Sequence, residues 1–258
     1  MLTFFRHIRK ALLDSGALAK YLLYAIGEIT LVVIGILIAL QINNWNQERL
    51  DKKKETEVVR ALYNELKSNY DYNTARINEL IWFTRLGREL LSLTGPSVSR
   101  DSKDSLSVHR KFFQLGRIYH PLTTKYRQIT ISEDFNLISD DSLRHLMIEY
   151  SSQLGMADVL FQKEAELGSR LETYIDDHGN TVDQIIYLST EGGDWLSEFE
   201  DLENSKFNEK KEEMYADSKF ENLIARRLKV MVFAKNRLSE VQDHILLMID
   251  HIEAGYDW

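Results

Sequence analysis

The sequence predicts an all-α protein with an N-terminal amphipathic helix, one transmembrane helix and an elongated antiparallel helical bundle. After residue 57 the apolar residues recur mostly three or four positions apart, as on one face of a helix, and no segment alternates convincingly as a strand does. The 258 residues include only 2 prolines and 12 glycines, the residues that interrupt helices. The stretch from residue 21 to 42 has an apolar density found nowhere else in the chain.

Residues 1–20 form the expected amphipathic segment on the cytoplasmic side, and its short helix ends before Ser15 and Gly16. Phe5, Ile8 and Leu12 fall on one helical face and the basic residues lie elsewhere. Such a helix lies in the membrane interface and assists the anchor that follows it. The same pattern also fits a tail that fills the groove of a partner protein.

Residues 21–42 form the expected transmembrane helix. Among these 22 residues only Glu28, Thr30 and Gln41 are plainly polar, and a helix of this length covers ~33 Å, enough to cross a bilayer. A buried helix of a soluble protein, the alternative, usually shows a polar stripe that is missing here. The apolar run exceeds the ~7–15 residues of a signal-peptide core and lacks a small-residue cleavage site, so an uncleaved anchor is expected.

The charges that flank this helix leave its orientation open. Four Lys or Arg residues precede it and four follow it closely, so the positive-inside rule alone does not decide. The first cluster lies on a short tail that need not cross, and a long C-terminal domain can translocate largely regardless of its charge. These two points favour a cytoplasmic N-terminus and an extracytoplasmic domain.

The stretches FFRHIRKALL and KYLLYAIGEITLVVIGILIALQINNWN, within residues 2–49, resemble the opening of an uncharacterised family of bacterial single-pass membrane proteins common in Bacteroidota. A later stretch, TTKYRQITISEDFNLISDDSLRHLMIEYSSQL, resembles that family's most recognisable downstream segment. The resemblance implies a location in the bacterial envelope and favours a cytoplasmic N-terminus. Together with the orientation inferred from the flanking charges, it leads us to expect an inner-membrane anchor and a periplasmic domain. The family has no assigned activity, so the resemblance supplies no catalytic residues.

Residues 43–57 are expected to continue the helix as a polar, solvated stalk, and residues 58–258 to form the bundle domain. The first helix of the domain is expected to reach about residue 93, with a break at 69–73, because NYDYN is poor helix material. A turn at 94–97 contains Gly and Pro.

Further helices are expected at 103–119 and 122–131, and two long ones follow. The first of these begins at a cap on Ser139 or Asp140 and stops at DDHGN, residues 176–180. The last, over residues 217–254, has the most regular apolar spacing in the domain.

Glu28 and Thr30 are the polar positions of interest within the membrane segment. An ionisable side chain inside a bilayer usually faces a partner, a cavity or a proton path. Glu28 therefore has three interpretations with a function, namely an acid bonded within an oligomer, a contact with another membrane protein, or a proton relay. Snorkelling to the interface without a function is the fourth. Gly27, Gly35 and Ala39 share a face that permits close approach of a second helix.

Glu240, His244 and His251 are the candidate metal ligands. They follow one stripe of the last helix, where Asp-His-Ile occurs twice, seven residues apart. Two histidines two turns apart need ligands from other helices to share one ion. Ordinary polarity of a helix surface is the competing interpretation, and no cofactor is predicted.

Composition and motifs exclude several classes of function. Residues 43–258 carry 28 basic and 38 acidic residues, which argues against nucleic acid as a partner. Cysteine is absent, so thiol catalysis and disulfides are excluded. No phosphate-binding glycine loop, nucleophile elbow or HExxH motif is present.

These exclusions favour a non-enzymatic interaction or scaffold protein. Its partners are expected to be the lipid bilayer and either itself, as an oligomer or coiled coil, or another membrane protein. The alternative is a ligand-sensing domain that signals through the membrane helix to a partner, and an enzyme is the third choice.

Overall fold

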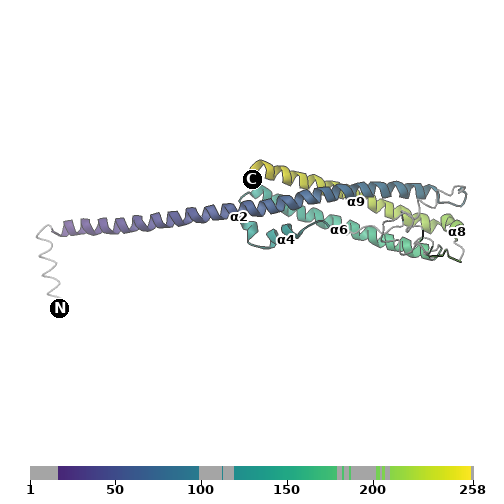
Figure 1. Cartoon of the computed structure of the whole chain (residues 1–258), viewed down its shortest axis with the longest axis horizontal. Coiled ribbons are helices and arrows are strands. Elements are labelled where there is room, and N and C mark those ends of the chain that lie inside the picture. The colour runs from purple at the N-terminus through teal and green to yellow at the C-terminus, as the bar shows by residue number, and fades with distance from the viewer. Residues whose placement is uncertain are drawn as a thin grey trace, which may run out of the picture. The chain divides into compact units, whose positions relative to one another are not determined.

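The computed structural model is helical throughout its regular structure (Figure 1). It describes residues 17–98, 112, 119–178, 182, 186, 202–203, 205–206 and 210–256. Among these residues it has no strand, and its helices are α2 (Ala17–Ser92), α4 (Thr124–Ile131), α5 (Asp134–Leu137), α6 (Asp141–Asp176), α8 (Lys211–Ala216) and α9 (Ser218–Gly255). The all-α prediction is confirmed. Most of the helices expected at 1–20 and 103–119 lies outside the described residues.

The chain divides into two units, residues 1–57 and residues 58–258. In the first unit, α2 exposes a continuous apolar surface: the large apolar side chains from Ile26 to Ile42 are 47–74% exposed. In the described part of the chain, α2 alone is long and apolar enough to cross a membrane. The composition that predicted a membrane helix therefore coincides with side chains that the described residues of this unit leave uncovered.

The second unit is built around one hydrophobic core. The part of α2 after Val58 shares this core with α6 and α9, and α4 and α8 add to it. Burial of the apolar stripes on these helices is the main favourable contribution to folding. Fully buried members from the three long helices include Leu62, Leu90, Tyr150, Leu171, Ile224 and Val241.

Helix α9 runs antiparallel to both of its long neighbours. Against α2, the Tyr63 hydroxyl donates to Glu253 Oε1 at 2.6 Å, and Gln242 Nε2 donates to Thr74 Oγ1 at 2.8 Å. Against α6, α9 lies alongside and in the opposite direction (Figure 1). The antiparallel expectation describes both pairs.

Helices α2 and α6, in contrast, run in the same direction. Asn69 Nδ2 donates to the Tyr150 hydroxyl at 3.1 Å, and further along both helices the Arg76 guanidinium carbon lies 5.1 Å from the ring centre of Phe161. This pair departs from the expected antiparallel arrangement because α6 begins at the end of the unit where α2 enters it: Asp140 lies beside His251 and Tyr63 beside Glu253, both near the C-terminal end of α9.

The break expected at 69–73 is wrong, because α2 continues through these residues. Asn69 Oδ1 accepts the backbone N–H of Leu122 at 2.8 Å, and its Nδ2 donates to the Leu122 carbonyl at 2.7 Å. Asn73 Oδ1 accepts from the Tyr119 hydroxyl at 3.1 Å. Asn69 therefore satisfies backbone groups of a distant segment, and Asn73 binds a tyrosine side chain of the same segment, so neither disrupts its own helix.

Glu65 lies one turn before Asn69 on the same face of α2. Together, Glu65, Asn69 and Asn73 form the buried polar stripe of α2. Its two carboxylate oxygens accept the backbone N–H groups of Lys125 and Tyr126 at 2.7 and 2.9 Å. These are first-turn donors of α4, which have no partner within the helix. The predicted short helix at 122–131 is confirmed as α4, and its N-terminus is capped by a residue from another helix.

The predicted ends of the long helices are close to the observed ones. Asp140 caps α6, because its side chain accepts the N–H groups of Ser142 and Leu143. The turn after α2 contains Gly95 at φ 121°, a conformation that favours glycine. The Gly95 N–H donates to the Tyr215 carbonyl at 2.8 Å.

Candidate functional site

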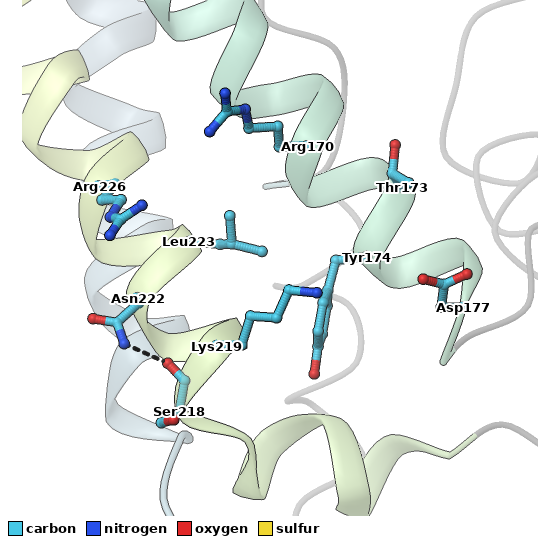
Figure 2. A pocket seen from close by; sticks show the side chains of 9 residues that line it. All are labelled: Arg170, Thr173, Tyr174, Asp177, Ser218, Lys219, Asn222, Leu223 and Arg226. Carbon is cyan, nitrogen blue, oxygen red and sulfur yellow. Dashed lines mark hydrogen bonds between the residues drawn. The ribbon is translucent and has the colours of Figure 1, made fainter.

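A groove of about 600 Å³ lies between the C-terminal part of α6 and the first turns of α9 (Figure 2). Three of its side chains are cationic and one is acidic, whereas the whole chain has a formal charge of −8. The groove is therefore a positively charged surface on an acidic protein. Its lining consists of Arg170, Thr173, Tyr174, Asp177, Ser218, Lys219, Asn222, Leu223 and Arg226.

One end of the groove is organised by the cap of α9. The Asp217 carboxylate accepts the Lys219 backbone N–H at 2.8 Å and also the Tyr174 hydroxyl from α6. The hydrogen bond from Tyr174 holds the pKa of Asp217 below its ordinary value. Burial, together with this carboxylate, raises the pKa of Tyr174. The pair joins the two helices and fixes the position at which α9 begins.

The cations of the groove come from both helices. Figure 2 shows the guanidinium groups of Arg170 and Arg226 extending toward each other across the groove. Arg170 pairs with Glu166 at 2.7 Å, and that carboxylate also pairs with Lys163. Among the described residues Arg226 makes no ion pair. Like charges that face each other in this way are mutually repulsive unless an anion lies between them.

A second hollow, of about 530 Å³, lies between residues 119–130 and α6. Its two tyrosine hydroxyls already donate hydrogen bonds within the protein. The Tyr126 hydroxyl donates to the Met147 carbonyl at 2.7 Å, and the Tyr119 hydroxyl donates to Asn73 Oδ1. Burial raises the pKa of both phenols. These groups hold the fold together, so the cationic groove is the stronger candidate for a ligand site.

A buried ion pair lies in the core of the second unit. Arg227 is 1% exposed and Glu164 is 2% exposed, and Arg227 Nε donates to Glu164 Oε1 at 2.9 Å. A second guanidinium nitrogen donates to the Phe112 carbonyl at 2.9 Å. Arg227 thus anchors residue 112 to the core.

The membrane-segment residues singled out in the sequence all lie on the exposed surface of α2 in the first unit. Glu28, Thr30, Gly27, Gly35 and Ala39 are exposed. A methyl group added at either glycine would meet nothing within 4 Å. The described residues of this unit therefore leave the small-residue face uncovered. They also make no contact with Glu28 that would explain a carboxylate in this apolar segment.

The three metal candidates serve as contacts of α9. His244 Nε2 lies 2.7 Å from the Leu146 carbonyl, and His251 Nε2 lies 2.7 Å from Asp140 Oδ2, so each histidine joins α9 to α6. Glu240 pairs with an arginine on its own helix. In the parts of the chain that the structure covers, no three His, Cys, Asp or Glu side chains are placed to hold a metal ion.

Sequence reasoning did not find the cationic groove. Arg170 is about fifty residues from Lys219 and Arg226, and all three stand among many charged residues on exposed helix faces. They come together only through the alignment of α6 with α9. The spacing of apolar residues within each helix does not predict how two helices align.

Residues 28–136 match a family described as a family of unknown function (DUF6090). The matched segment begins at Glu28 and ends in α5, so it includes the buried polar stripe of α2 and excludes every residue of the cationic groove. No curated protein and no solved structure matches the chain. The match fits the resemblance to an uncharacterised domain.

Proposed function

We propose that this chain is a membrane-anchored, non-enzymatic interaction protein of the bacterial inner membrane. The N-terminus lies in the cytoplasm, α2 crosses the membrane over residues 21–42, and residues 58–258 form a periplasmic helical domain. The observation that carries the proposal is the uncovered apolar surface of α2 from Ile26 to Ile42. In water that surface would be strongly unfavourable, whereas in lipid it needs no other cover.

The partner of the anchor is a second membrane helix, from another copy of this chain or from a larger complex. Glu28 lies seven residues into the segment, about 10 Å along the helix axis, where a lone carboxylate facing lipid is costly. The face formed by Gly27, Gly35 and Ala39 allows the backbone of another helix to approach closely. Such a contact would take Glu28 away from lipid.

The first test is membrane extraction and topology. The full-length protein is expected to stay with the membrane after alkaline carbonate washing. A reporter fused after residue 258 is expected to be active only outside the cytoplasm. Release by carbonate would overturn the anchor, and a reporter active only in the cytoplasm would reverse the orientation.

The second test concerns association. In-membrane cross-linking of wild type is expected to give oligomers or a mixed complex that weakens in Gly35→Leu and in Glu28→Gln. Val33→Leu is the matched control, because two residues along a helix point its side chain to the opposite face from Gly35. Only monomer in wild type, or equal effects of Gly35→Leu and Val33→Leu, would refute association through this face.

A sensing role is the second candidate, and the cationic groove favours it. A hollow with several converging polar side chains is the usual form of a ligand site. In this proposal the periplasmic domain binds a small molecule and passes the change through α2 to a partner protein.

A further inference from the structure

We propose that the groove between α6 and α9 binds a phosphate group, the chemistry shared by inorganic phosphate, phosphate monoesters and phospholipid headgroups. The inference deepens the sensing proposal by naming its ligand class. It does not depend on the membrane anchor, which lies in the other unit of the chain.

The charge of the groove is the first argument. Arg170, Lys219 and Arg226 converge from two helices, and Asp177 is the one acid in the lining. The lining side chains thus carry two net positive charges, which match a phosphate dianion, and Glu166, the partner of Arg170, is shared with Lys163. The second carboxylate nearby, Asp217, accepts from Tyr174 and from the α9 backbone, so its charge is already partly compensated.

The arrangement of the two arginines is the second argument. Their guanidinium groups face each other with Leu223 between the helices (Figure 2). Guanidinium forks bind phosphate through paired N–H···O bonds, and two forks can hold different oxygens of one phosphate. An anion between them converts mutual repulsion into two attractions.

The supporting groups fit the same ligand. The Lys219 ammonium lies 5.2 Å from the centre of the Tyr174 ring, which positions it over the groove. Asn222 Nδ2 donates to the Ser218 carbonyl at 2.8 Å, and its second amide hydrogen is available to another acceptor. These groups lie at the start of α9, where the helix dipole favours negative charge.

The test is hydrogen–deuterium exchange and calorimetry on the full-length protein in nonionic detergent. Inorganic phosphate is added at constant ionic strength, with chloride as the reference anion. Binding is expected to be saturable and to slow exchange in peptides that cover residues 170–178 and 218–226. Arg226→Gln and Arg170→Gln are each expected to weaken binding about tenfold or more, because each removes charge-assisted hydrogen bonds.

The matched control is Arg85→Gln. Arg85 is a highly exposed arginine of α2 that pairs with Glu89 four residues away, as Arg170 pairs with Glu166. The control lies outside the groove and is expected to leave phosphate binding unchanged. Binding that weakens equally in all three variants would reflect general charge and would overturn the proposal.

A second arm identifies the source of the phosphate group. Protein reconstituted in nanodiscs of phosphatidylcholine is compared with protein in nanodiscs that also contain phosphatidylglycerol. Protection by free phosphate supports a soluble ligand, and Arg226-dependent protection only in phosphatidylglycerol discs supports a lipid headgroup. Absence of both effects in wild type overturns the proposal, whereas the membrane extraction test would be unaffected.

Discussion

The packing of α2 against α9 can be tested with two glycines that differ in the space around them. A methyl group at Gly87, in α2, would lie 2.4 Å from Leu228 Cδ2 and 2.6 Å from Phe112 Cε2. At Gly155, in α6, a methyl group would meet nothing within 4 Å. Comparing the stabilities of alanine variants at these two positions therefore separates the cost of close packing from the gain in helix propensity.

The expected magnitudes follow from these distances. Alanine in place of an interior helix glycine gains about 1 kcal/mol at either position, because alanine is the better helix former. Gly155→Ala keeps this gain, so its free energy of unfolding is expected to rise by about 1 kcal/mol. At Gly87 the added methyl group overpacks the core, which costs about 1–3 kcal/mol. The difference between the variants cancels the shared propensity and equals the overpacking cost.

The assay is urea unfolding of the full-length protein in nonionic detergent, followed by far-UV circular dichroism. Gly87→Ala is expected to unfold at lower urea than Gly155→Ala, with equal dependence of the free energy on urea concentration in both. Gly168→Ala should fall between them, because its methyl group would lie 3.3 Å from the guanidinium of Arg227. Equal stability of Gly87→Ala and Gly155→Ala would refute the close approach of α2 and α9.

Three further predictions concern polar side chains of the second unit. Arg227→Met leaves Glu164 buried and unpaired, so we expect a loss of about 3–5 kcal/mol in unfolding free energy; adding Glu164→Leu should recover most of it, and no recovery would contradict the pairing. Asn69→Ala removes three hydrogen bonds and is expected to cost about 2–4 kcal/mol, with faster hydrogen exchange at residues 119–126; unchanged exchange there would count against the contact. Asp140→Ala should cost about 1 kcal/mol at neutral pH through loss of the α6 cap. Burial tends to raise the pKa of Asp140, but hydrogen bonds from the α6 backbone and from His251 outweigh it and lower the pKa. The stabilisation is therefore complete above the pKa of the unfolded state and is lost as pH falls through the pKa of the folded state. The unfolding free energies of wild type and Asp140→Ala should therefore converge at acid pH. A difference between them that stays constant with pH would refute the lowered pKa.

The sequence predicted the elements of this fold well because each is encoded locally. Ser139 and Asp140 could both be recognised as candidate helix caps from their side chains and positions, and Asp140 is the one that caps α6. The last helix was expected at 217–254 and is observed as Ser218–Gly255. Apolar spacing and capping residues report on a few neighbouring positions, and helix boundaries depend on little else.

Contacts between distant segments could not be predicted in the same way. NYDYN has low helix propensity, yet Asn69 and Asn73 find their partners near residue 120, so the helix continues. The cationic groove depends in the same way on how α6 and α9 align. A single sequence shows which side chains are polar, but it does not show which of them will be in contact in the folded protein.

The buried polar stripe of α2 explains why the helices adopt this topology. Apolar burial is not directional, so the stripes on α2 and α6 could pack in either relative direction. Hydrogen bonds are directional. Glu65 and Asn69 bind the backbone of residues 122–126, and Asn69 Nδ2 and the Tyr126 hydroxyl in turn donate to the Tyr150 hydroxyl and the Met147 carbonyl of α6. Each such bond contributes about 0.5–1.5 kcal/mol, and those to an ionised carboxylate contribute more. A few of them are comparable with the 5–15 kcal/mol by which a domain is typically stable, enough to select the parallel pairing of α2 and α6 over its reverse.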